Sequence, residues 1–210
     1  MTGPGGRADR GVLDFVLGAL PPPPARVLEV GAGGGDLAAD LADAGYDVLA
    51  IDPAATDGSV VPVALLDLDA PSASFDAAVA VVSLHHVEPL EPSCAHLATL
   101  VRRGGALVVD EFDVAAFDEP AAGWLCARWR ELGREAPDDP AAMVGDLRDH
   151  LHPVERIRSV LSHAFALSPA TRGPYLHRWY LTPDFRAPEN EAIAAGTIPA
   201  VGVRFTGVRR

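Results

Sequence analysis

Hydrophobic positions in the first quarter of the chain alternate between the spacing of a helix and that of a buried strand. Apolar residues at 13, 16, 17 and 20 predict a helix, which the prolines at 21–24 end because proline lacks an amide donor. Residues 25–30 predict a strand that leads into a glycine-rich turn, followed by a helix that ends at Gly45. A strand over 46–51 closes a βαβ unit, so the sheet is expected to be parallel here.

The middle of the chain continues this alternation. Further strands are predicted over three apolar segments, 60–66, 77–84 and 106–110. Before the last of these, an apolar stripe at positions 97, 100 and 101 predicts a helix whose last turn holds Arg102 and Arg103. Strands that alternate with helices in this way predict an α/β fold with a doubly wound sheet.

The pattern changes after Glu111, where longer amphipathic segments replace the short strands. Helices are predicted over 117–132, 141–152 and 153–161, with a loop at 137–140. We expect residues 113–162 to form a helical lid over the carboxyl ends of the strands, within a single domain that spans 1–210. Further strands are predicted at 165–167 and 200–206, the second after a helix that Gly196 caps.

Composition excludes several classes of function. Hydrophobic residues make up 49% of the 210 positions, enough to fill a sizeable core. All 17 basic residues are arginine, so mechanisms that need a lysine, such as a Schiff base or a pyridoxal phosphate anchor, are excluded. The net charge of −12 argues against a large nucleic-acid or membrane surface, and a small-molecule partner is expected instead.

The expected compartment and metal content rest on three kinds of signal that the sequence lacks: a membrane span, a signal peptide and paired cysteines. The longest uncharged stretch, Ser159–Thr171, is shorter than a membrane helix needs, and Met1–Arg10 lacks the apolar run of a signal peptide. Cys94 and Cys126 have no CxxC spacing, so neither a disulfide framework nor a zinc site is predicted. A cytoplasmic protein without a metal is expected.

The glycine turn indicates a cofactor site, because glycine lets the backbone approach a ligand closely and a helix follows. The dinucleotide fingerprint G-x-G-x-x-G would need Gly or Ala at position 36, where this chain has Asp36. The pattern present is Glu29-x-Gly31-x-Gly33-x-Gly35, which resembles motif I of class I S-adenosylmethionine-dependent methyltransferases. A glycine turn built only for helix packing is the alternative.

This resemblance implies S-adenosylmethionine as the cofactor. Its methionine part would lie against Glu29 and the turn residues Gly31, Ala32, Gly33 and Gly35. Asp52, which Pro53 follows at the end of the second strand, offers two carboxylate oxygens for the ribose hydroxyls. The family also has a Rossmann-like seven-stranded sheet, mostly parallel with an antiparallel last strand.

The segment from Ser74-Phe75-Asp76 to Leu84-His85-His86 resembles the small-molecule, methyltransferase type 11-like branch of that superfamily. In that pattern an acid near the adenine maps onto Asp67, followed by Leu68, with Asp69 as a competing candidate. Ser83 and Leu84 would lie alongside the cofactor. Ser83–His86 stands where nucleic-acid and protein amide methyltransferases carry an Asn/Asp-Pro-Pro-aromatic tetrad, which favours a small-molecule acceptor.

Methyl transfer by in-line displacement depends mostly on alignment and water exclusion, and a base is needed only for a protonated acceptor. His86 is the first candidate for this base and His85 the second, although either could be a packing residue. An acceptor pocket lined by Trp124, His150 and Tyr175 is the corresponding substrate hypothesis.

Three hypotheses about function remain. The first is methyl transfer to an O, N or C atom of a small molecule. The second is S-adenosylmethionine binding without transfer, as in a cyclase or a regulatory module. The third is a nicotinamide-dependent oxidoreductase on a similar fold. The acidic cluster at 110, 111 and 113 is interpreted as a polar strand end rather than a metal site.

Overall fold

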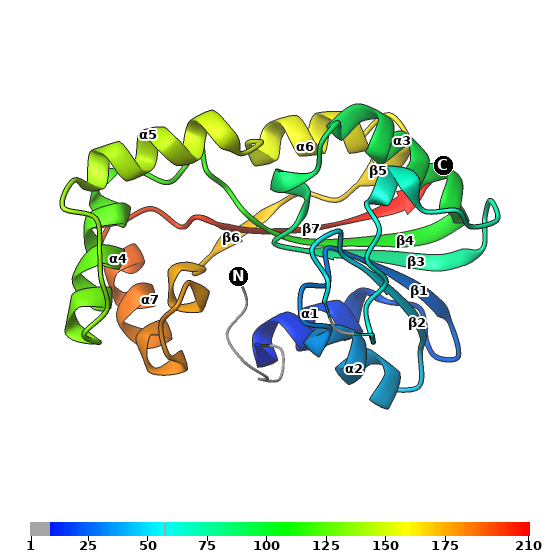
Figure 1. The fold of residues 1–210 in the computed structure, drawn as a ribbon, viewed down its shortest axis with the longest axis horizontal. Coiled ribbons are helices and arrows are strands. Elements are labelled where there is room, and N and C mark those ends of the chain that lie inside the picture. Colours follow the sequence, from blue (N-terminus) through cyan, green and yellow to red (C-terminus); the bar gives the residue numbers. More distant parts are fainter. Residues whose placement is uncertain (1–8, 57) are drawn as a thin grey trace.

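The computed structural model describes residues 9–56 and 58–210 (Figure 1). Most of the segment Met1–Arg10, on which the signal-peptide prediction rests, lies outside the described residues. The strands are β1 (Arg26–Val30), β2 (Asp47–Ile51), β3 (Phe75–Val81), β4 (Val101–Phe112), β5 (Phe165–Leu167), β6 (Thr171–Gly173) and β7 (Gly202–Arg209). The helices are α1 (Arg10–Ala19), α2 (Asp36–Asp43), α3 (Leu90–Leu100), α4 (Glu119–Glu131), α5 (Pro140–His150), α6 (Val154–Leu161) and α7 (Arg186–Ala194).

All seven strands form one sheet in the order β2-β1-β3-β4-β7-β5, with β6 also paired to β7. Strands β2, β1, β3 and β4 are parallel to one another, whereas β7 runs antiparallel to β4, β5 and β6. The predicted α/β fold, with a mostly parallel sheet and an antiparallel last strand, is confirmed.

Helices cover both faces of the sheet, as Figure 1 shows. One core cluster joins α1 and α2 to one face, through residues such as Val16, Leu41 and Val79. The opposite face packs against α3 and α6, through Leu97 and Ile157. Residues that alternate along each strand enter the two clusters in turn, which explains why the central strands are apolar throughout.

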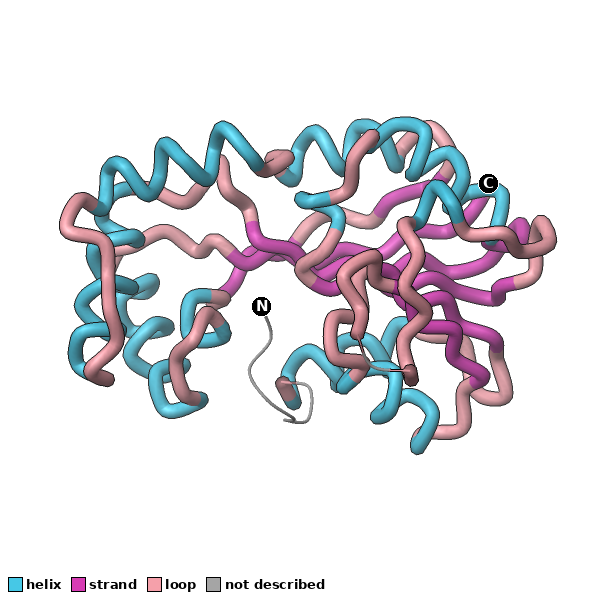
Figure 2. Tube along the Cα trace, viewed as in Figure 1, coloured by secondary structure: helices cyan, strands magenta, loops and turns pink. Residues whose placement is uncertain are grey.

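A third cluster lies beyond the end of β4 and joins α4 and α5 to the segment 175–201. Figures 1 and 2 show these helices at one end of the molecule, away from β1 and the edge strand β2. The segment predicted to form a lid, 113–162, includes α6, but α6 packs on the sheet. Whether α4 and α5 cover a bound substrate remains a prediction.

The strand predicted over 60–66 is wrong. Only Val61 bridges to Ile51, because Pro62 has no amide to continue the ladder, and the chain turns into a short 3₁₀ helix at Leu65–Asp67. The seventh strand is instead Thr171–Gly173, on the other side of the sheet.

The predicted end of the helix before β4 is also wrong. Helix α3 ends at Leu100, and Arg102 and Arg103 already belong to β4. The Nε atom of Arg102 donates to Asp76 Oδ1 at 2.7 Å, which holds this arginine against β3. Gly104 and Gly105 lie in an irregular stretch of β4 and do not form a turn before it. Within the described residues, no helix is both long and apolar enough to span a membrane.

Candidate active site

The glycine turn between β1 and α2 depends on left-handed backbone conformations. Gly31, Gly33 and Gly35 have φ values of 72°, 54° and 81°. A Cβ atom on Gly31 would lie 2.3 Å from the Cβ of Ser83, so this glycine lets the turn contact the end of β3. The turn therefore meets Ser83, another residue expected beside the cofactor.

Glu29 carries a buried carboxyl group just before this turn. Its side chain is 3% exposed, and its Oε2 atom has no hydrogen-bond partner. Burial, with a smaller contribution from Asp36, raises the pKa of Glu29 to about 8. A buried carboxyl group without a partner fits a cationic ligand group, such as the ammonium of a bound amino acid.

Asp52 joins the end of β2 to the glycine turn. Its Oδ2 atom accepts a hydrogen bond from the Gly33 amide at 2.9 Å, and Oδ1 accepts one from the Ala54 amide at 2.8 Å. A carboxylate has about four lone-pair positions, so these two bonds orient Asp52 and leave acceptor capacity for hydroxyl groups. The exposed Pro53 continues the same turn.

A short 3₁₀ helix, Leu84–His86, follows β3, and the buried Glu111 of β4 holds it in place. Glu111 Oε1 accepts hydrogen bonds from the amides of Ser83 and Leu84, at 2.9 and 2.6 Å. Its Oε2 atom lies 2.5 Å from His85 Nδ1. Sequence reasoning had not assigned Glu111 to the site, although an acid within the apolar run of a central strand was a usable signal.

The two candidate bases have different surroundings. His85 is 4% exposed, and its ring centroid lies 4.3 Å from that of His86. With Nδ1 bound to Glu111, the nitrogen that His85 has free is Nε2. His86 is exposed to solvent, and partial burial together with the neighbouring His85 lowers its pKa, which favours the neutral imidazole near pH 7.

The residues predicted to hold adenine lie on the short 3₁₀ helix at Leu65–Asp67 and just beyond it. Asp67 and Asp69 are both exposed, so the structure does not choose between them. Leu68 is buried, and its carbonyl oxygen lies 2.9 Å from His96 Nε2. Adenine recognition by these residues remains a prediction.

The predicted acceptor-pocket residues are dispersed. Tyr175 is buried and stacks on Phe112, with a ring-centroid distance of 5.1 Å, while Trp124 packs at the edge of the same cluster. The side chain of His150 is 71% exposed, and its Nδ1 lies 2.6 Å from the Asp146 carbonyl. The structure thus groups only Tyr175 with the end of β4.

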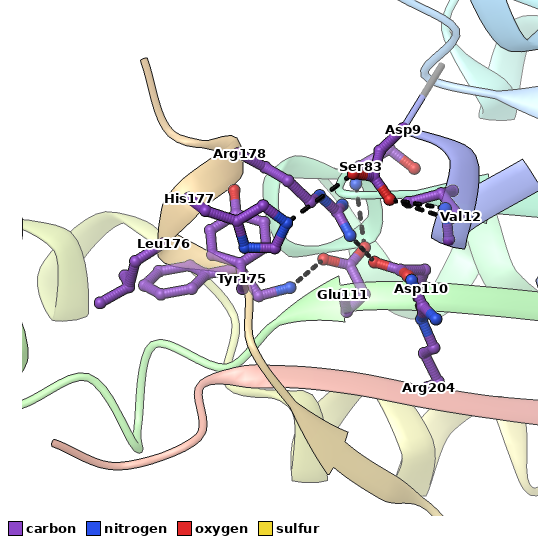
Figure 3. A network of polar contacts seen from close by, with 12 residues as sticks. Asp9, Val12, Ser83, Asp110, Glu111, Tyr175, Leu176, His177, Arg178 and Arg204 are labelled. Atoms are coloured by element: carbon purple, nitrogen blue, oxygen red, sulfur yellow. Dashed lines mark hydrogen bonds and ion pairs between the residues drawn. The ribbon is translucent and has the colours of Figure 1, made fainter. Parts of the chain in front are cut away.

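The acidic cluster at the end of β4 forms ion pairs and backbone contacts. Asp110 accepts from Arg178 at 2.7 Å and from Arg204 at 2.5 Å (Figure 3). Asp113 accepts from Arg172 at 2.7 Å. These contacts agree with the interpretation of a polar strand end.

Comparison with known proteins identifies the family of this chain. The family model described as "Methyltransferase domain" matches residues 6–165. No curated protein matches the sequence. Many solved structures share the fold, and three of them illustrate the range of their activities. A protein of Anabaena variabilis, described as a methyltransferase from an antibiotic biosynthesis pathway, is 19% identical, with a TM-score of 0.63 over 97% of this chain and 98% of its own.

The second structure is the 1,6-didemethyltoxoflavin-N1-methyltransferase of Burkholderia thailandensis, with bound 1,6-didemethyltoxoflavin and S-adenosylhomocysteine. It is 18% identical, with a TM-score of 0.57 over 95% of this chain and 77% of its own. The third is the [4+2]-cyclase SpnF, 17% identical, with a TM-score of 0.60 over 95% of this chain and 80% of its own. The family match covers most of the chain and includes the glycine turn, the Ser83–His86 segment and Glu111. The chain therefore belongs to the methyltransferase domain family and is a class I, S-adenosylmethionine-dependent enzyme.

Proposed function

We propose that this enzyme transfers the methyl group of S-adenosylmethionine to a small-molecule acceptor. The observation that carries the proposal is Glu29, a buried carboxyl group whose Oε2 atom has no hydrogen-bond partner, placed just before the glycine turn. Such a group costs free energy in the free protein and is explained by a ligand that brings a positive charge. The sulfonium of S-adenosylmethionine supplies an electrophilic methyl group.

The chain's own residues bind and orient the cofactor in this proposal. Glu29 faces its ammonium group, and Gly31, Ala32, Gly33 and Gly35 let the backbone approach its methionine part. Asp52 and Pro53 lie toward the ribose, and Asp67 and Leu68 toward the adenine. Ser83 and Leu84, which Glu111 fixes through their amides, form the wall between the cofactor and the acceptor.

Proton removal from the acceptor is assigned to the histidine turn. His86 is the first candidate because it is exposed and its lowered pKa favours a neutral imidazole. His85 is the second candidate, since Glu111 fixes its ring and orients Nε2. Trp124, His150 and Tyr175 remain the proposed acceptor contacts, of which the buried Tyr175 lies nearest in the fold to β4.

The acidic surface supports a small acceptor over a nucleic acid. A net charge of −12 repels phosphate backbones, and no lysine is present to contact them. The Burkholderia thailandensis structure contains a bound small molecule, which supports the same class of acceptor by analogy. The acceptor atom, O, N or C, is open in this proposal.

The test combines cofactor binding with product detection. Calorimetric titration should give micromolar binding of S-adenosylmethionine, about −8 kcal/mol, and no heat with NAD. A screen of phenolic and amino metabolites should then release S-adenosylhomocysteine with at least one acceptor. Heat with NAD alone would contradict the cofactor assignment.

A cyclase is the second candidate, because the cyclase SpnF is among the similar structures. The same screen separates the two functions. Tight binding of the cofactor, together with conversion of an added compound without S-adenosylhomocysteine release, would favour a protein that uses the cofactor without transferring its methyl group.

A further inference from the structure

A cavity of about 160 Å³ lies on the α1 side of the sheet, beside the end of β4. Charged side chains from several elements line it: Asp9, Asp110, Arg172, Arg178, Arg186 and Arg204. None of the glycine-turn residues lines this cavity, so it is separate from the proposed cofactor contacts. One lining residue, Asp110, directly precedes Glu111 on β4 (Figure 3). Glu111 accepts hydrogen bonds from the amides of Ser83 and Leu84, so the cavity adjoins the residues that hold the proposed cofactor contacts.

The lining carries an excess of positive charge in a protein that is acidic overall. Four guanidinium groups face two carboxylates, and the excess falls to one when Asp113, the partner of Arg172, is counted. Asp110 is shared by two arginines, Arg178 and Arg204. One carboxylate thus serves two cations, which leaves N–H donors of the arginines available for a further anion.

Arg186 supplies the unpaired cation. Over the described residues, its guanidinium makes no ion pair or hydrogen bond, although it lies against the first turn of α1. A Cβ atom on Gly11 would be 2.9 Å from both Nη1 and Nη2 of Arg186, so the guanidinium packs directly on the backbone of this turn. A cation at the amino end of a helix is unfavourable by itself, because the helix dipole is positive there.

His177 adds a buried imidazole to the lining of the same cavity. It is 4% exposed, its Nδ1 lies 2.7 Å from Glu189, and its Nε2 makes no hydrogen bond. The nearest acid to Nε2 is Asp9, at 3.7 Å. Asp9 and Glu189 thus pair with this imidazole and raise its pKa despite its burial, and in its protonated form the ring adds to the positive charge of the cavity wall.

We propose that this cavity binds a carboxylate of the methyl acceptor, with Arg186 and Arg178 as its principal contacts. This inference rests on the proposed function, because it identifies the ligand of the cavity as the methyl acceptor. Arg178 is a suitable partner because its side chain is 12% exposed and its guanidinium is held by Asp110 and by the ring of Tyr175, whose centroid is 5.0 Å away. The acceptor class is therefore a small organic acid.

The size of the cavity suggests the probe. An engineered cavity of about 150 Å³ holds benzene, so 4-fluorobenzoate is of suitable size, and 4-fluorobenzamide has the same shape without the charge. Fluorine NMR titrations should show binding of the acid to the wild-type protein, with and without S-adenosylhomocysteine. The amide should bind at least tenfold more weakly.

Arg186→Gln is the matched test variant, and Arg103→Gln is its control, an exposed arginine at the opposite end of β4. Losing one charge-assisted contact should weaken 4-fluorobenzoate binding about 10- to 100-fold in the first variant and leave it unchanged in the second. Equal binding of acid and amide, or an acid affinity that Arg186→Gln does not change, would overturn the proposal.

The cofactor also has a carboxylate, which a further comparison distinguishes. S-adenosylhomocysteine contains the amino-acid group, and 5′-methylthioadenosine lacks it. Arg186→Gln could weaken the binding of S-adenosylhomocysteine at least tenfold and leave that of 5′-methylthioadenosine unchanged. The cavity would then bind the carboxylate of the cofactor, and the acceptor assignment would be wrong. If S-adenosylhomocysteine failed to bind the wild type, the proposed function would fall, while the benzoate titration of the free protein would still report on the anion site.

Discussion

Glu29→Gln should make the protein more stable at neutral pH while weakening cofactor binding. The substitution keeps the size of the side chain and removes its ability to ionise. Glu29 is 3% exposed, its Oε2 atom lacks a hydrogen bond, and burial raises its pKa to about 8. Ionisation of this group therefore opposes folding, whereas the unfolded chain ionises freely near pH 4.5.

The sign and size follow from the difference between the two pKa values. Below about pH 4.5 the carboxyl group is protonated in both states, so ionisation costs nothing. Between that pH and about 8, the unfolded state is favoured by about 1.4 kcal/mol per pH unit, which amounts to about 3 kcal/mol at pH 7. The glutamine variant lacks this cost, so its advantage should be near zero at pH 4.5 and grow up to pH 8.

Urea unfolding of both proteins at pH 5, 6, 7 and 8 measures this advantage directly. Cofactor titrations over the same range provide a second readout, because ionised Glu29 is the proposed partner of the ammonium group. Wild-type affinity should increase with pH toward 8, and the variant should bind more weakly with a flatter profile. Unfolding free energies that differ by the same amount at pH 5 and pH 8 would refute the reasoning.

Three further substitutions test other parts of the site. Gly31→Ala should destabilise the protein by about 2–3 kcal/mol, because its Cβ would meet Ser83; urea unfolding measures this, with the open helical position Gly18→Ala as control. Asp52→Ala should weaken cofactor binding about 30- to 100-fold in calorimetry, and an unchanged dissociation constant would remove it from the ribose site. His86→Ala should keep cofactor affinity within a few-fold and lower turnover by about 10² to 10⁴, with partial recovery at high pH; wild-type turnover would transfer the base role to His85.

Local patterns in the sequence predicted the part of the fold that holds the cofactor. The first βαβ unit, its glycine turn and Asp52 follow one another within about thirty residues, and short-range backbone rules govern all of them. The contact of Asp52 with the Gly33 amide follows from that topology, because the carboxyl ends of neighbouring parallel strands meet at one edge.

The wrong predictions share a physical origin. Apolar residues at 60–66 resembled a strand, but Pro62 interrupts the ladder there, so tertiary pairing is limited to one bridge. Arg102 resembled a cation at a helix end, but its ion pair with Asp76 on β3 belongs to the sheet. In the first case a proline within the segment stops strand pairing, and in the second a partner on another strand decides the outcome; the spacing of apolar residues reveals neither.

The site also depends on long-range contacts made by two buried glutamates. Glu111 accepts from the amides of Ser83 and Leu84 and binds His85 Nδ1. Glu189, from α7, accepts from the amides of Tyr175, Leu176 and His177 and binds His177 Nδ1. Partners that are 12 to 28 residues apart have no shared spacing, which is why sequence analysis found the first histidine turn and missed its glutamate.

These two glutamates have the same physical role at the two places proposed to bind ligands. A short 3₁₀ helix leaves amides without partners, and one buried carboxylate satisfies them while it fixes the adjacent histidine ring. His85 then has Nε2 free beside the proposed cofactor wall, and His177 directs Nε2 toward Asp9 in the arginine-lined cavity. The pair of Asp110 on β4 and Arg178 after His177 joins the two turns. This pair places the arginine-lined cavity one residue along β4 from Glu111, which holds the wall proposed to separate acceptor from cofactor.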